Sequence, residues 1–309
     1  MSGSTQLETV DERPVLRFER RFAHRAEKVW RTITDPAELA HWFPAAVSGD
    51  LRPGGVLTFT FEGEDKGTDG EVLTFDAPRE FAFSWNSDAL RWVLTPDGDG
   101  CLLEFTHTFG RGESAIARLA AGRNAAGWDT CLDALSARLT GETPVQPTNW
   151  HDRMAAYVEE WHLGEGEVDG GVLRFRRDLV WKPLDEVWPL LAPEPLKPGD
   201  PAPAAAGNGR LVPGEVTVAD APRVLEFSWL DNGKPAGSVR WELVRDELDG
   251  VRAELTQTLP GDHPALAAEL AAWHERMAAL FAATFGVEPE PWPADRVEAL
   301  TKHYTKQGL

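Results

Sequence analysis

The stretch Gly70–Trp85 reads GEVLTFDAPREFAFSW, and Gly214–Trp229 reads GEVTVADAPRVLEFSW. The two stretches share ten of their sixteen residues and begin 144 residues apart. Repeats that stack into solenoids or propellers have periods of about 20–50 residues, so this spacing is that of a whole domain. The sequence therefore predicts two copies of one domain.

Shorter echoes follow in the same order along both copies. They are VLRF at Val15 and Val172, VW at Val29 and Val187, RW at Arg91 and Arg240, FTHTF at Phe105 with LTQTL at Leu255, and Trp128 with Trp273. A chain of 309 residues suits two domains, each large enough to bury its own core. We predict a first domain at residues 10–165 and a second at 168–309, each with a short tail helix.

The charge and composition exclude several classes of partner. The net charge is −19, and the acidic residues are spread along the chain, so nucleic acid and anionic lipid are not expected to bind. No run of about 18 apolar residues predicts a membrane span. The N-terminal segment is polar and unlike a signal peptide, and two cysteines without a CxxC motif fit a reducing compartment. A cytoplasmic acidic protein is expected.

The first copy alternates helix and strand signals in a recognisable order. Val15–Phe22 alternates apolar and polar residues as a half-buried strand does, and short helices are predicted at Ala26–Ile33 and Pro36–Trp42. Further strands are predicted at Leu57–Phe61, Val72–Thr74, Phe81–Trp85, Trp92–Leu94 and Leu103–Phe109. A long helix from about Glu113 to Leu139 ends before Gly141. This order predicts an α+β fold in which a curved antiparallel sheet and a long helix enclose a concave space for a small ligand.

Four segments of the first copy resemble one known superfamily. They are RFERRFAHRAEKVWRTITDPAELAHWF from Arg17, DAPREFAFSW from Asp76, LEFTHTF from Leu103 and GWDTCLDALSARLTGE from Gly127. They are similar to the SRPBCC (START-like, helix-grip) superfamily, and most of all to the branch homologous to the activator of heat-shock-protein-90 ATPase. The resemblance covers residues 15–142 well and 172–285 more loosely. It implies two tandem helix-grip domains with hydrophobic cavities, and it implies no single activity.

The copies differ in the segment that covers the cavity in helix-grip folds. Trp30 and Gly70 are 40 residues apart, but Trp188 and Gly214 are only 26 apart. The second copy lacks the second short helix and has a proline-rich run at 193–203, which cannot be a regular helix. We therefore expect the deeper pocket in the first copy, although a second copy with an open mouth for a larger ligand is the alternative.

Ten residues of the first copy are candidates for ligand contact. They are Arg20, Trp42, Phe43, Phe59, Phe83, Trp85, Trp92, Phe105, His107 and Trp128. Trp42 and Phe43 have no counterpart in the second copy and lie on the predicted lid, so they are the stronger candidates. Arg20 and its counterpart Arg177 share a face with apolar residues, which fits either a clamp for a ligand carboxylate or a structural ion pair with a nearby carboxylate or carbonyl.

His107 shares a face with Leu103 and Phe105, which fits either a proton-transfer group or a hydrogen-bonded core residue. No acid is placed by the sequence to tune it. The chain holds no GxSxG, HExxH or P-loop motif, and its histidines show no paired metal spacing, so no catalytic residue, metal or cofactor is predicted.

The leading hypothesis is a tandem-domain protein that holds a small hydrophobic molecule in the first copy and catalyses no defined reaction. One alternative is an enzyme resembling the didomain aromatase/cyclases of polyketide pathways, with Arg20 and His107 exchanging protons. The other is a chaperone-cofactor or other protein-binding role with an unidentified protein partner.

Overall fold

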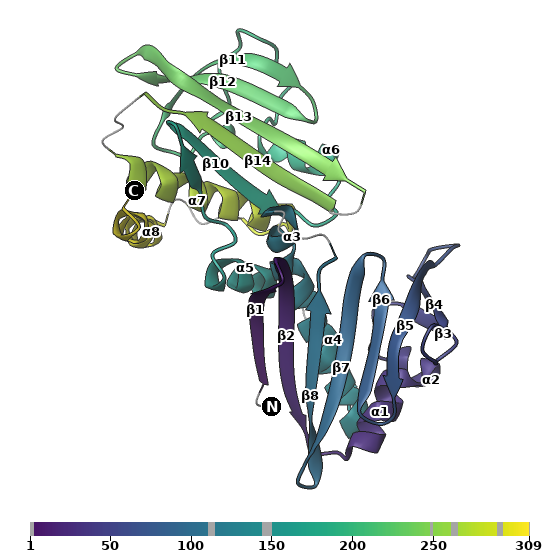
Figure 1. The fold of residues 1–309 in the computed structure, drawn as a ribbon. Coiled ribbons are helices and arrows are strands. Elements are labelled where there is room, and N and C mark those ends of the chain that lie inside the picture. Colours follow the sequence, from purple (N-terminus) through teal and green to yellow (C-terminus); the bar gives the residue numbers. More distant parts are fainter. Residues whose placement is uncertain are drawn as a thin grey trace. The chain divides into compact units, whose positions relative to one another are not determined.

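The computed structural model describes residues 3–110, 115–143, 150–247, 250–260, 265–288 and 293–308. Contacts within the chain divide it into two compact units, residues 1–157 and 158–309. The division falls inside helix α5 (Trp150–Glu160), whereas the boundary at 165–168 stays a prediction. Each unit is an antiparallel sheet with one long helix against it (Figure 1), so the predicted α+β fold of tandem helix-grip domains is confirmed.

The sheet of the first unit has the strand order β1-β2-β8-β7-β6-β5-β4-β3, and every neighbouring pair is antiparallel. The strands are β1 (Gly3–Val10), β2 (Arg13–Phe22), β3 (Ala46–Gly49), β4 (Val56–Thr60), β5 (Thr68–Asp76), β6 (Glu80–Trp85), β7 (Asp88–Asp97) and β8 (Gly100–Thr108). The sequence did not predict β1 and β3. Both are edge strands without a fully buried residue, so neither shows the apolar alternation that marks a strand.

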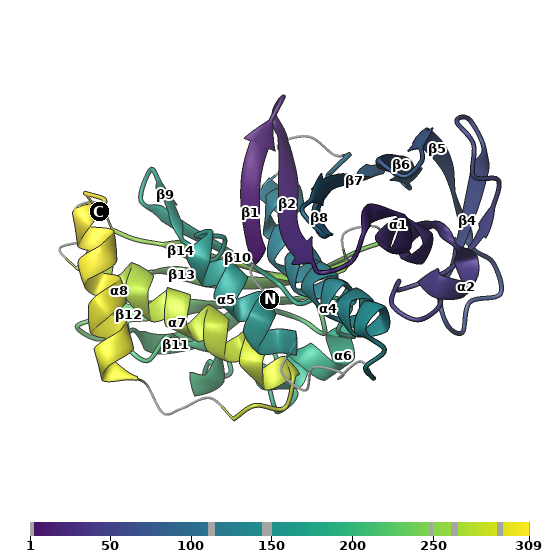
Figure 2. The same ribbon diagram turned by 90° about the horizontal axis from the view of Figure 1, so that it is seen from below.

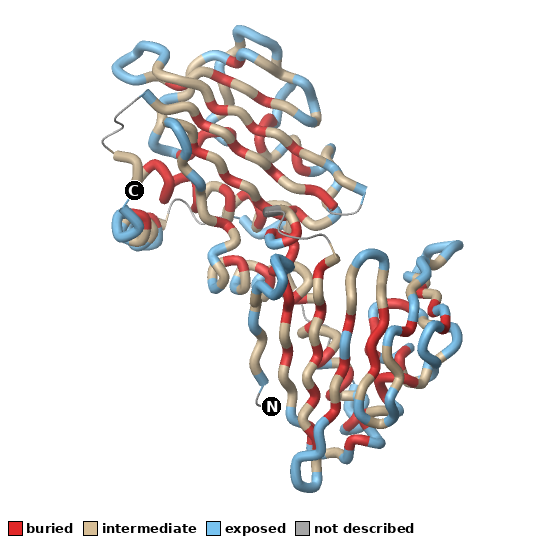
Figure 3. The backbone as a smooth tube through the Cα atoms, viewed as in Figure 1, coloured by how far each residue is buried: buried red, intermediate tan, exposed pale blue. Residues whose placement is uncertain are grey.

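One row of apolar side chains crosses the middle of this sheet. Phe18 on β2 is opposite Phe105 on β8, which is opposite Trp92 on β7, which in turn is opposite Phe81 on β6. The rings of Phe18 and Phe105 stack with centroids 5.4 Å apart, and those of Phe105 and Trp92 with centroids 3.9 Å apart. Buried and less buried residues alternate along these strands (Figure 3), because successive side chains point to opposite faces.

The helices of the first unit are α1 (Ala26–Thr34), α2 (Pro36–Leu39), α3 (Ala115–Leu119), α4 (Ala121–Thr140) and the first part of α5. The predicted long helix is divided into α3 and α4, and its expected start at Glu113 lies outside the described residues. Helix α4 crosses one face of the sheet (Figures 1 and 2) and ends at Gly141, whose φ of 79° is left-handed as predicted. Helix α2 has only four residues, and turns replace the predicted helix as far as Trp42.

The second unit has a six-stranded antiparallel sheet with the order β11-β12-β13-β14-β10-β9. Its strands are β9 (Glu167–Asp169), β10 (Val172–Asp178), β11 (Val212–Asp220), β12 (Val224–Asp231), β13 (Lys234–Asp246) and β14 (Gly250–Thr258). Its helices are α6 (Leu184–Val187), the 3₁₀ turns η1 (Trp188–Leu190) and η2 (Ala204–Ala206), the long α7 (Leu266–Thr284) and α8 (Ala294–Lys306). Residues 193–203 form no helix, as their prolines predicted. None of the described helices is both long and apolar enough to span a bilayer.

Candidate functional site

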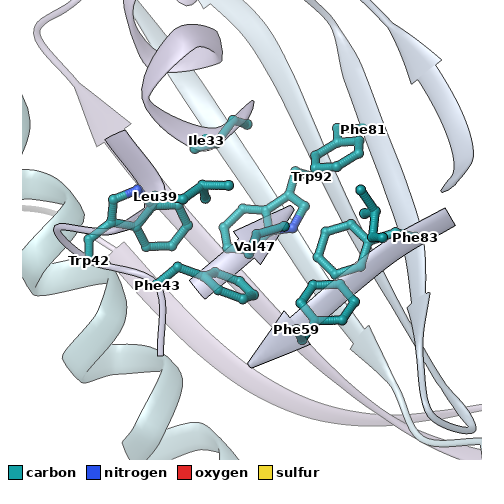
Figure 4. Close-up of a pocket in the computed structure, with 10 residues that line it drawn as sticks. Ile33, Leu39, Trp42, Phe43, Val47, Phe59, Phe81, Phe83 and Trp92 are labelled. Carbon is teal, nitrogen blue, oxygen red and sulfur yellow. The ribbon is translucent and has the colours of Figure 1, made fainter. Parts of the chain in front are cut away.

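A small apolar cavity lies in the first unit among side chains from α1, α2, β3 and the central strands (Figure 4). The residues that line it are Ile33, Leu39, Trp42, Phe43, Val47, Leu57, Phe59, Phe81, Phe83 and Trp92. All ten side chains are aliphatic or aromatic, and none is ionisable. The cavity volume is about 10 Å³, room for about one water molecule. The site is therefore nearly filled by its own lining.

Trp42 and Phe43, the predicted lid residues, supply much of that filling. Their exposed fractions are only 5% and 8%. The turns after α2 carry both side chains inward, where Trp42 meets Trp92 edge-on with ring centroids 5.5 Å apart. One hydrogen bond holds Trp42 to the segment behind it, from its Nε1 to the carbonyl oxygen of Thr32 at 2.9 Å. A ligand larger than a water molecule can enter only if these two side chains move.

The sheet side of the cavity contains three other predicted residues, Phe59, Phe83 and Trp92. Trp85 lies beside the lining and stacks on Phe59 with ring centroids 4.8 Å apart, while Phe105 lies behind Trp92. Five lining residues were not predicted: Ile33, Leu39, Val47, Leu57 and Phe81. Strand alternation could have identified Leu57 and Phe81, which share a face with Phe59 and Phe83. The other three come from helices or from the unpredicted strand β3.

His107 is a structural residue with an acid beside it, Asp88, which the sequence did not place there. Its Nε2 is 2.8 Å from Asp88 Oδ2, and Trp128 Nε1 donates to its Nδ1 at 3.0 Å. Because an indole N–H can only donate, Nδ1 has no proton, and the neutral ring donates from Nε2 to Asp88. Both nitrogens of His107 are thus occupied, and it lies outside the cavity lining.

Asp88 is held as a carboxylate by its hydrogen bonds. Burial raises its pKa, but the bonds from His107 and from the backbone N–H of Gly110 at 2.9 Å outweigh burial, so the pKa lies below its usual value. The β7–β8 hairpin at 97–100 sets the register that brings Asp88 near His107. The residues Asp97-Gly98-Asp99-Gly100 are typical of a turn, so the contact could have been found by extending the register from them.

Arg20 forms a structural ion pair rather than a free cation in the cavity. Its Nη2 bonds the carboxylate of Asp129 on α4, and its Nη1 donates to the carbonyl oxygens of Ser4 at 3.0 Å and Glu19 at 2.8 Å. Tyr157 donates to the other oxygen of Asp129. Arg20 is therefore not available to a ligand in the cavity, which it does not line.

Its counterpart Arg177 lacks such a partner among the described residues, contrary to the expectation for an ion pair. The side chain is 2% exposed, its Nε has no hydrogen bond, and its guanidinium lies over the ring of Phe281, 4.4 Å from the centroid. The reason lies on the long helix, where His274 follows Trp273 as Asp129 follows Trp128. Burial lowers the pKa of Arg177 to about 10, against the opposing charges of Glu159 and Asp178, so Arg177 stays charged at neutral pH.

The corresponding region of the second unit is filled by backbone. Ala206 and Asn208, from the segment that replaces the lid, are both fully buried. Trp241, the counterpart of Trp92, donates from Nε1 to the carbonyl oxygen of Ala206 at 2.8 Å. Asn208 donates to Glu269 on α7 at 2.7 Å and accepts from the backbone N–H groups of Arg210 and Leu211 at 3.0 Å.

The cavity, its lid and strands β3 to β8 lie within a segment that matches a known family. Residues 23–140 match the family described as Activator of Hsp90 ATPase homolog 1-like protein. The N-terminal domain belongs to this family. The resemblance to the activator branch of the SRPBCC superfamily is thereby confirmed for this domain, which the match covers from the end of β2 to the last turn of α4.

No curated protein matches the chain. Among solved structures, CalU16 from Micromonospora echinospora is 24% identical over 52% of this chain and 99% of its own, with a TM-score of 0.42. A conserved protein of unknown function from Enterococcus faecalis, EF2215, is 16% identical over 51% of this chain and 90% of its own, with a TM-score of 0.43. Likenesses at this level carry no argument about ligand or reaction.

Proposed function

We propose that the N-terminal domain binds a small hydrophobic molecule in the cavity behind Trp42 and Phe43 and catalyses no reaction on it. The observation that supports this most is the lining: ten side chains converge from helices and strands, and none can ionise. Such a surface favours apolar molecules through burial, at about 25 cal/mol per Å² removed from water. It offers no acid, base or nucleophile to act on them.

Binding requires the lid to open, because the cavity holds only about one water molecule. The bond of Trp42 to Thr32 is the only side-chain hydrogen bond of the two lid residues to the described residues, and breaking it costs about 1 kcal/mol. A ligand that replaces the two aromatic side chains among the lining can offset that cost with its own buried surface. Opening the lid therefore breaks one side-chain hydrogen bond and the contacts of two aromatic rings.

The cyclase-like alternative loses support from the positions of its two candidate residues. Arg20 is bound to Asp129, and both nitrogens of His107 are bonded to Trp128 and Asp88. Neither residue lines the cavity, so neither can exchange a proton with a molecule held there without rearrangement. No particular contact favours the protein-binding alternative.

A neutral fluorophore, N-phenyl-1-naphthylamine, tests the proposal on the full chain. We expect one molecule to bind per chain, and we expect Val47→Trp to abolish binding, because the new side chain occupies the cavity from the edge strand β3. Val212→Trp is the matched control, since Val212 is 58% exposed on an edge strand of the second unit. Failure of the wild-type protein to bind, or equal binding by the Val47→Trp variant, would overturn the proposal.

A further inference from the structure

The lining of the N-terminal cavity includes one indole N–H group, that of Trp92, with no acceptor among the described residues. Trp92 is 1% exposed and lines the cavity (Figure 4), and its Nε1 donates to no residue that the structure describes. The indoles of Trp42 and Trp128 do find acceptors, in Thr32 and His107. An indole N–H that borders a binding cavity and donates to no described residue can donate to an acceptor on a ligand.

The second unit shows which kind of acceptor a tryptophan at this position binds. Trp92 is opposite Phe81 and Phe105, and Trp241 is opposite Leu225 and Leu255, the residues that correspond to them in the repeat. The two indoles therefore have the same place in the two sheets. Trp241 donates to a carbonyl oxygen, that of the buried Ala206.

We infer that the ligand of the N-terminal cavity carries a carbonyl-type acceptor oxygen on a hydrophobic body and that Trp92 Nε1 donates to this oxygen. This inference rests on the proposed function. In the second unit the chain supplies its own carbonyl, and in the first unit the ligand supplies it. Trp92 thereby distinguishes ketones, esters and amides from hydrocarbons of the same shape, while the rest of the lining selects for apolar surface.

Acetophenone and α-methylstyrene test the inference, because they differ in having a C=O or a C=CH₂ group of similar shape. We expect the wild-type chain to bind acetophenone roughly two- to tenfold more tightly, the range that one net hydrogen bond supplies. Trp92→Phe removes the N–H and should abolish that preference while α-methylstyrene still binds. Ligand-detected NMR measures both affinities.

The outcomes separate this inference from the proposed function. If neither the fluorophore nor either compound binds the wild-type chain, the proposed function fails and the inference fails with it. If the fluorophore binds but neither compound does, only the inference is wrong. If both bind equally, or if the Trp92→Phe variant keeps the preference for acetophenone, only the role of Trp92 is wrong.

A separate cluster in the second unit carries an independent inference. His162 follows α5, His303 lies on α8, and both approach one oxygen of Glu165. His162 Nδ1 is 2.7 Å and His303 Nε2 is 2.6 Å from Glu165 Oε1. The two imidazole rings are parallel to within 9°, with centroids 5.5 Å apart. One ligand atom from each residue lies within 4.8 Å of the others.

The hydrogen bonds of this cluster conflict without a cation. Gln307 Nε2 is 3.0 Å from His303 Nε2 and 3.1 Å from Glu165 Oε2. If His303 Nε2 is protonated, as its contact with Glu165 requires, it faces the Gln307 amide donor. If it is not, its lone pair faces the carboxylate. Flipping the amide places the Gln307 oxygen against the Glu165 oxygen.

We propose that His162, Glu165 and His303 bind one divalent transition-metal ion of the Zn²⁺ type. Two imidazoles and one carboxylate are ligands that such ions prefer, and each nitrogen would direct its lone pair at the ion instead of at the Glu165 carboxylate. His162 is 61% exposed at its side chain, which leaves an entry path for the ion. The ion would tether α8 to the start of the second unit, since Glu165 and His303 are 138 residues apart.

Calorimetric titration of the tag-free full chain with Zn²⁺ tests this site. We expect one strong site per wild-type chain and binding weakened by roughly tenfold or more in His303→Ala, because even the loss of a partner outside the coordination sphere costs about 10–100-fold. His162→Asn is a second variant, chosen because asparagine tolerates the φ of 55° at this position. His41→Ala, which removes an exposed histidine of the first unit, should bind as the wild type does. Equal binding by the wild-type, His303→Ala and His162→Asn proteins would overturn the proposal.

Discussion

The two units have the same fold, yet they fill the space beside their central tryptophan in different ways. In the first unit the side chains of Trp42 and Phe43 fill it, with one side-chain hydrogen bond, to Thr32. In the second unit backbone fills it, fixed by the bonds of Ala206 and Asn208. Side chains can rotate away at modest cost, whereas removing a buried backbone segment leaves several polar groups without partners. The difference teaches that the filling of the first unit can open at a lower cost than that of the second.

The equivalent arginines Arg20 and Arg177 also have different partners in the two units. Arg20 is paired with Asp129, and Arg177 lies over an aromatic ring with no hydrogen bond to a described carboxylate. Glu159 is the carboxylate whose charge acts most on Arg177. It is itself paired with Arg296 at 2.8 Å and with His274 at 3.3 Å. One substitution on the long helix, aspartate in the first copy and histidine in the second, accounts for the change.

The largest expected effect concerns the buried segment of the second unit that contains Ala206 and Asn208, here called the backbone plug. Asn208→Ala removes one donor and two accepted hydrogen bonds at a fully buried position and should lower the free energy of unfolding by about 3 kcal/mol. Urea denaturation measures the loss, and hydrogen exchange assigns it to the second unit. Asn124→Ala is the control, because among the described residues that part-buried side chain bonds only the carbonyl oxygen of Ala120 on its own helix. A loss below about 1 kcal/mol would show that the plug is not held by this residue.

The second prediction compares the two arginines. Arg20→Leu leaves the largely buried Asp129 without its cation and should cost about 2–3 kcal/mol. Arg177→Leu removes a buried charge whose Nε has no hydrogen bond and for which no described carboxylate is a bonded partner. We therefore expect a change within about 1 kcal/mol of zero. Thermal and urea unfolding of both variants decide this. Equal losses would mean that Arg177 is paired as Arg20 is.

The third prediction compares the two central tryptophans. Replacing either by phenylalanine removes similar volume, but only Trp241→Phe strands an acceptor, the carbonyl oxygen of Ala206. We therefore expect Trp241→Phe to be more destabilising than Trp92→Phe by about 1–2 kcal/mol. Matched urea denaturation curves give the difference. Equal losses would contradict the inference that Trp241 has a bonded acceptor where Trp92 has none, and with it the proposed carbonyl group on the ligand.

The smallest expected effect is a pH dependence confined to the second unit. The hydrogen bond from His274 lowers the pKa of Glu159 to about 2, outweighing burial, with Arg296 contributing. Because the pKa falls on folding, the stabilisation is full above the usual value of about 4.5 and is lost as the pH falls toward 2. Glu159 is 37% exposed at its side chain, so solvent screening reduces the effect to about 1 kcal/mol. Glu159→Gln should flatten the stability profile in this window, and an unchanged profile would argue against the contact.

Periodic patterns were sufficient for the fold. Alternation in Val15–Phe22 and in the later strands, and the helical pattern that runs to Leu139, were enough to predict the sheet and the long helix. Burial of one face gives strands a period of 2 and helices a period of 3.6. The edge strands β1 and β3 were not predicted, because an edge strand can form hydrogen bonds without burying side chains. The proline-rich run at 193–203 also predicted that the second copy lacks the lid helix, and these residues form no helix.

Side-chain partners were decided only by tertiary structure. The hydrogen bond from Trp128 to His107, and the ring of Phe281 beneath Arg177, depend on helix packing that brings distant residues within a few ångströms. The approach of His303 to Glu165 is of the same kind, because 138 residues separate them. The sequence by itself determined which faces are buried, since hydrophobicity is local to each residue. Which polar atoms meet on those faces is a property of the packed molecule, because a hydrogen bond requires a distance of about 3 Å that no periodic pattern encodes.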